Sequence, residues 1–90
     1  MLYVITQDGL GIIPVPKYTY VYANECGDKS SGIFSGLYRI ENNGADGKRN
    51  FLGVYTGKDQ AQRILASLAG AMAGANRKMM VFTMPEDKKE

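Results

Sequence analysis

The chain has 90 residues, enough for one small domain and too few for two. A hydrophobic fraction of 44% and a charged fraction of 22% are typical of a soluble globular protein and exclude a disordered or collagen-like chain. His is absent, which removes His-based catalysis and most zinc and haem ligand sets. The formal net charge of +2 is too weak to indicate a nucleic-acid-binding protein by itself.

The sequence predicts a cytoplasmic protein. Its single cysteine, Cys26, has no partner for an internal disulfide, and the N-terminus lacks the basic and then apolar layout of a signal peptide. The longest strongly apolar run, 64–75, has 12 residues, whereas a membrane span needs about 20. We therefore expect no transmembrane segment.

An N-terminal hairpin is expected at residues 1–15. The first six residues are rich in β-branched and aromatic side chains, and they lead to Asp8-Gly9, a dipeptide typical of hairpin turns. The return strand, 10–15, contains Pro14, which has no N–H to donate. This strand should therefore lie at a sheet edge.

Three more strands are expected before the helix. Residues 17–23 alternate in side-chain type and predict a strand, whereas 24–32 is polar and rich in Gly and Ser and predicts a loop. The apolar runs 33–40 and 49–55 should pair as an antiparallel hairpin with a long loop between them.

The period then changes to that of a helix. Thr56 is the expected N-cap, with Asp59 in the favourable first turn, and the helix should end near residues 74–76. Residues 79–84 predict a final strand. One apolar stripe follows the helix, made of Ala61, Ile64, Leu65, Leu68 and Met72.

These elements predict an α+β fold in the order βββββαβ, with a mostly antiparallel sheet of about five to six strands and one helix packed on one face. We expect a single domain at residues 1–85 and a charged C-terminal tail at 86–90. One helix covers little of the sheet in so small a chain, so a homo-oligomer, most simply a dimer, is expected.

Two surfaces are candidate interaction sites. Tyr18, Tyr20 and Tyr22 share one face of the strand at 17–23, and aromatic side chains on a sheet can stack single-stranded bases. Cross-strand packing of the same tyrosines is the favoured interpretation, because few basic residues are available to hold a nucleic-acid backbone.

The second candidate surface lies on the helix, where small side chains form a smooth face. Such a face allows close approach of another backbone, either the protein's own sheet or a second copy of the chain. The residues of this helix face are Ala66, Ala69, Gly70 and Ala73.

No catalytic, cofactor-binding or metal-binding residue is predicted, and we expect no enzyme activity. Cys26 lies in an acidic stretch, which works against a reactive thiolate, and the loop at 42–47 departs from the calcium-loop pattern at its ligand positions. The acids considered all fall in predicted turns, loops or a cap, where solvation is expected: Asp8, Glu25, Asp28, Glu41, Asp46 and Asp59.

Three short stretches carry a resemblance to other proteins: the opening YVITQD at 3–8, LGVYT at 52–56 and the closing VFTMP at 81–85. In these the chain resembles a loose group of small proteins of unknown function from Gram-positive bacteria and their phages. The resemblance implies a strand–helix–strand arrangement and a cytoplasmic location, and no function transfers with it.

The sequence therefore predicts a non-enzymatic protein-interaction module that self-associates. A weak single-stranded nucleic-acid binder acting through the tyrosine face is the alternative.

Overall fold

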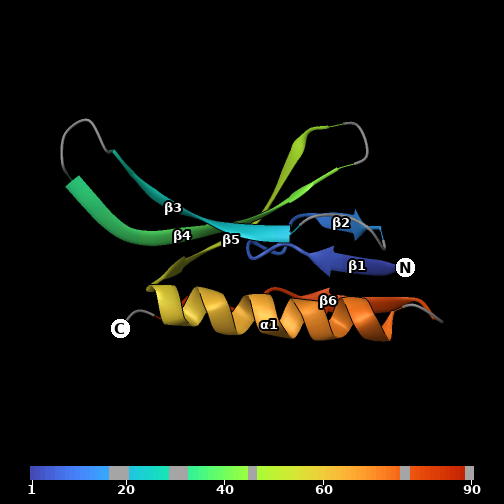
Figure 1. Ribbon diagram of the computed structural model, residues 1–90. Helices are drawn as coiled ribbons and strands as arrows, with labels where there is room; N and C mark the ends of the chain where they lie inside the picture. The colour runs from blue at the N-terminus through green and yellow to red at the C-terminus, as the bar shows by residue number, and fades with distance from the viewer. Residues whose placement is uncertain (17–20, 29–32, 45–46, 76–77, 89–90) are drawn as a thin grey trace.

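The computed structural model describes residues 1–16, 21–28, 33–44, 47–75 and 78–88 (Figure 1). Within them the order βββββαβ confirms the α+β fold expected from the sequence. The elements are β1 (Leu2–Ile5), β2 (Ile12–Val15), β3 (Val21–Asp28), β4 (Ile33–Asn43), β5 (Arg49–Thr56), α1 (Lys58–Gly74) and β6 (Met80–Thr83).

The strands form two sheets of three rather than one continuous sheet. The first sheet has the order β2-β1-β6, and the second is the antiparallel meander β3-β4-β5. Only β1 and β6 pair in parallel among the described strands, which agrees with the mostly antiparallel expectation. β2 and β6 occupy both edges of β1, so no strand of the meander pairs with β1.

Gln7 connects the two sheets at the outer edge of β5. Its backbone N–H donates to the carbonyl of Leu52 over 2.9 Å. Its side-chain amide then pairs with Val54 as another strand would, donating to the carbonyl and accepting from the N–H, each at 2.8 Å. Because these bonds use backbone groups of the β5 edge, Gln7 both fixes the sheets together and closes that edge.

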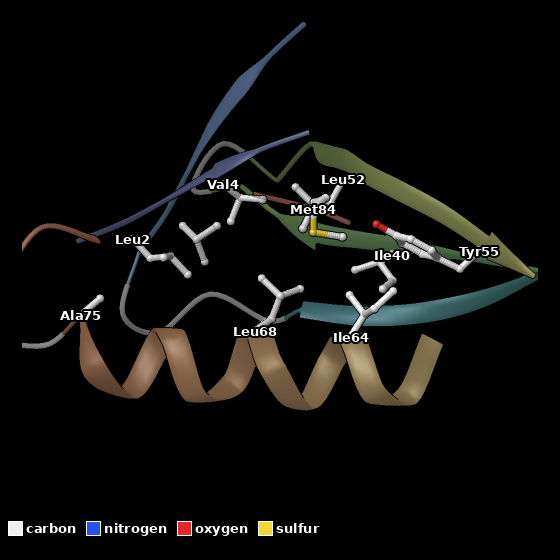
Figure 2. Close-up of a cluster of buried hydrophobic side chains, with 10 residues drawn as sticks. Leu2, Val4, Ile40, Leu52, Tyr55, Ile64, Leu68, Ala75 and Met84 are labelled. Atoms are coloured by element: carbon white, nitrogen blue, oxygen red, sulfur yellow. The ribbon is translucent and has the colours of Figure 1, made fainter. Parts of the chain in front are cut away.

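The hydrophobic core lies between α1 and the inner faces of both sheets (Figure 2). The helix stripe expected from the sequence faces this core: Ile64 and Leu68 are buried, and Leu65 and Met72 pack against them. Burial of this stripe, rather than helix propensity alone, holds α1 in place. The buried core residues are Leu2, Val4, Val15, Ile40, Leu52, Tyr55, Ile64, Leu68, Ala75 and Met84.

The start of α1 differs from the sequence prediction. Thr56 is the last residue of β5, and the N-cap is Gly57, which has a φ of 85° and makes no side-chain cap. The positive φ of Gly57 turns the chain from strand to helix, so Thr56 is left in the ladder. Asp59 does lie in the first turn, and the helix ends at Gly74 as expected.

The prediction of a loop at 24–32 is wrong for residues 24–28, which belong to β3. β3 continues to Asp28 and pairs with β4 as far as Ile33, while residues 29–32 lie outside the described part. Likewise, Glu41 belongs to β4 and not to a loop. In both places the long β3–β4 ladder satisfies the backbone groups, and this overrides the local preference of polar residues for turns.

Asp87 and Lys88 lie against the start of α1. The Asp87 carboxylate accepts hydrogen bonds from the Thr56 N–H and hydroxyl, each at 2.8 Å, and from the Gln60 amide at 2.9 Å. The Lys88 N–H donates to the Gln60 side chain over 2.9 Å. Residues 86–88 of the expected tail are therefore fixed to the domain.

Candidate interaction surface

The first sheet has an apolar outer face. Side chains of a strand alternate between the two faces of a sheet, and directly paired residues lie on the same face. On β1, Leu2 and Val4 are buried in the core, so Tyr3 and Ile5 lie on the other side. Tyr3 pairs with Val81, and Ile5 pairs with Ile12, which extends this outer face over all three strands.

A shallow groove of about 380 Å³ runs over this face. We call its lining residues the apolar face: Tyr3, Ile5, Ile12, Met79 and Val81. Three of them are large and mostly exposed, with exposed fractions of 65% for Ile12, 71% for Met79 and 61% for Val81. None of the five carries a charge.

Such a face is unusual for a sheet that is covered on one side only. A solvated sheet face normally carries polar side chains, and contiguous exposed apolar patches mark interaction sites. The sequence carries a signal for this face: residues 2–5, 12–15 and 80–83 are almost continuously apolar, which is typical of strands covered on both faces.

The predicted tyrosine face is only partly within the described residues. Tyr18 and Tyr20 lie outside them, while Tyr22 is half-buried in β3 and pairs with Glu41 of β4. The two therefore share one face of the second sheet, and Glu41 sets a carboxylate beside Tyr22.

On the same outer face of the second sheet, polar side chains contact one another. The Arg39 guanidinium lies 5.0 Å from the centre of the Phe51 ring and 3.9 Å from a Glu41 carboxylate oxygen. Asn24 donates to Glu41 over 3.3 Å. Glu41 is 7% exposed, so the expectation that it is a solvated loop acid was wrong, because the β4 ladder carries it into this cluster.

The small residues of the helix point away from the core. Ala66, Ala69, Gly70 and Ala73 are all exposed, and a Cβ added at Gly70 would meet no atom within 4 Å. Tight packing of this face on the protein's own sheet, one of the two alternatives, is therefore wrong for Gly70. The physical reason is that the larger apolar stripe on the opposite side of α1 takes the contact with the core.

Among the acidic residues, Asp8 lies in the turn of the first hairpin. Asp8 accepts from the Thr6 hydroxyl at 2.6 Å and from the Leu10 N–H at 3.0 Å, and these hydrogen bonds lower the pKa of its carboxyl. No group of three or more His, Cys, Asp or Glu side chains lies close enough to hold a metal ion among these residues. Asp8 thus serves the turn of the first hairpin.

Within the described residues, no helix is long and apolar enough to cross a membrane. Comparison with protein-family models, with curated proteins and with solved structures gives no match. The resemblance to small proteins of Gram-positive bacteria and their phages stays a prediction.

Proposed function

We propose that this chain is a non-enzymatic protein-interaction module that self-associates through its first sheet. The observation that carries the proposal is the apolar face, an uncharged and exposed groove on a sheet that the core already covers on its other side. Water contact with this face costs free energy, and association that covers part of the face lowers this cost.

A second copy of the chain is the occupant that we propose. Identical copies of a chain meet most often about a two-fold axis, where the same surface of each copy contacts the other copy. A charged patch placed on such an axis would repel itself, whereas the apolar face has no charge to oppose. Its neutrality therefore favours a copy of the same surface as the partner.

Single-stranded nucleic-acid binding through the tyrosine face has less support. A phosphate backbone needs a positive groove, but Arg39 is already engaged by Glu41 and Phe51 on that side of the second sheet. The proposal places the protein in a reducing cytoplasm, since Cys26 is its only cysteine.

Sedimentation equilibrium from micromolar to millimolar protein tests this function. We expect the mass to rise from 9.9 kDa toward twice that value, and Val81→Lys to hold the chain at the monomer mass. Ala69→Lys, on the exposed helix face, is the matched control and should leave the association unchanged. A wild-type monomer at every concentration rejects the proposal, and loss of association in Ala69→Lys alone would assign it to the helix face.

A further inference from the structure

The strand β6 offers unused backbone hydrogen-bonding groups at the edge of the first sheet. The Met80 N–H donates to the carbonyl of Met1 over 3.1 Å, and the Met84 N–H donates to that of Ile5 over 3.0 Å. Backbone groups of successive residues alternate between the two sides of a strand. The N–H and C=O groups of Val81 and Thr83 therefore point away from β1, toward an edge where the described residues place no other strand.

The other sheet edges carry features that hinder pairing, and β6 does not. Pro14 lies at an outward-facing position of β2 and has no N–H. The β5 edge at Val54 is closed by the amide of Gln7. The register of β3 shifts between Cys26 and Gly27, as at a bulge. Charges, prolines and bulges are common means of protecting an edge, and Met80–Thr83 contains none of them. Short length is another such means; β6 has four residues, and Pro85 follows two residues after its end.

We propose that two copies of the chain pair their β6 strands antiparallel about Phe82, so that two three-stranded sheets become one sheet of six. This inference rests on the proposed self-association and names its geometry. Val81 of each copy would lie opposite Thr83 of the other, and these pairs exchange the outward N–H and C=O groups. Phe82 would face its own copy on the two-fold axis.

The charges that flank β6 select this register. In antiparallel pairing about Phe82, residues at equal distance on either side meet across the axis. Lys78 precedes Phe82 by four residues and Glu86 follows it by four, so Lys78 of each copy comes opposite Glu86 of the other. Both side chains are exposed. Shifting the two strands by two residues would lose this match, while the register about Phe82 makes it twice.

The same pairing covers the β6 side of the apolar face. Val81 comes against Thr83 of the second copy, and Met79, which is 71% exposed, comes against Pro85. Because Pro85 has no N–H, the backbone hydrogen bonds between the copies are those of the Val81–Thr83 pairs. The dimer therefore covers the β6 margin of each apolar face and sets the two faces side by side, while Ile12 at each end stays exposed.

Charge exchange tests the register. We expect K78E and E86K each to weaken dimerisation about tenfold, because each sets two like-charged pairs across the interface. The double variant K78E/E86K restores opposite charges and should return the dissociation constant to within about threefold of wild type. Neither side chain is buried, so these variants are expected to fold, and circular dichroism checks this.

Cross-linking tests the same register by distance. Opposite residues that form a hydrogen-bonded antiparallel pair, as Val81 and Thr83 would, have Cα atoms about 5.5 Å apart, which a disulfide can bridge. In a Cys26→Ser background, mixing V81C with T83C should give a covalent heterodimer on mild oxidation, and T83C alone should give several-fold less.

The outcomes separate the two proposals. A wild-type chain that stays monomeric rejects the self-association and this inference with it. A wild-type dimer whose affinity is insensitive to K78E and E86K, or which gives no preferential V81C–T83C disulfide, leaves self-association standing and overturns pairing about Phe82.

Discussion

The two sheets handle their outer faces in opposite ways. On the second sheet, Arg39, Glu41, Asn24 and Phe51 contact one another, so the face is complete within one chain. On the first sheet the apolar face meets no other part of the described chain, and the neighbouring edge of β6 keeps its backbone groups free. The difference shows where a small domain is self-sufficient and where a second molecule is needed.

The largest effect is expected from a substitution that tests how tightly side chains pack around Gly53 of the second sheet. A Cβ at Gly53 would lie 2.9 Å from the Tyr55 ring and 3.2 Å from the Gln7 Cβ. Neither neighbour moves easily, since both side chains are hydrogen-bonded. Gly53→Ala should therefore lower the free energy of unfolding by about 3 kcal/mol in urea denaturation.

Gly70→Ala is the matched control for that change. Its Cβ meets open space on the exposed side of α1, so the substitution should raise the free energy of unfolding by about 1 kcal/mol. Equal changes in the free energy of unfolding for Gly53→Ala and Gly70→Ala would contradict the close packing at Gly53 or the open space at Gly70.

Tyr55 makes the same closed region sensitive to high pH. Its hydroxyl donates to the Pro85 carbonyl over 2.7 Å, and burial, reinforced by the Asp87 carboxylate, raises its pKa to about 12. The unfolded chain loses this proton near pH 10, its ordinary value, so stability is full below pH 10 and falls as the pH rises to 12. The expected loss is about 2–3 kcal/mol.

Urea denaturation at several pH values between 9 and 12 measures this loss. Tyr55→Phe removes the titrating group and should flatten the pH dependence relative to wild type. A wild-type slope that persists unchanged in Tyr55→Phe would assign the effect to other groups.

Asn42 is the exception within the second sheet. Its side chain is fully buried on β4, and neither its amide nitrogen nor its oxygen has a hydrogen-bond partner among the described residues. A buried polar group without a partner costs about 1–3 kcal/mol. Asn42→Val should therefore raise the free energy of unfolding by about 1–2 kcal/mol, and a thermal melt that shifts downward would show that the amide is satisfied in solution.

The smallest expected effects compare the two outer faces directly. Arg39→Ala removes the contacts with Phe51 and Glu41, and should cost about 1 kcal/mol. Ile12→Thr alters only an exposed position of the apolar face, so at monomeric concentrations it should change the free energy of unfolding by less than about 0.5 kcal/mol. A larger loss for Ile12→Thr than for Arg39→Ala would mean that the apolar face already packs against another part of the same chain.

The elements of the fold were predictable because their signals are local. The Asp8-Gly9 turn, the apolar stripe of the helix and the edge position of Pro14 each follow from a few neighbouring residues. The division into two sheets was not predictable, since it depends on which strand takes each edge of β1. The extension of β3 into residues 24–28 also required the pairing with β4, which a polar sequence conceals.

The candidate site was harder to predict for a related reason. Sequence patterns drew attention to tyrosines and small residues, whereas the surface that stands out is built from ordinary strand residues such as Ile12 and Val81. Their exposure depends on which face of the sheet α1 covers. Only the pairing of three strands from both ends of the chain brings Met79 and Ile5 to the same groove.

Amide hydrogen exchange as a function of protein concentration tests most directly whether a second molecule completes the first sheet. We expect protection of the Val81 and Thr83 amides to rise steeply as the dimer forms, while protection of the Val54 amide, already bonded to Gln7, stays constant. Exchange at Val81 and Thr83 that does not change with concentration, in a chain shown to be dimeric, would contradict this expectation.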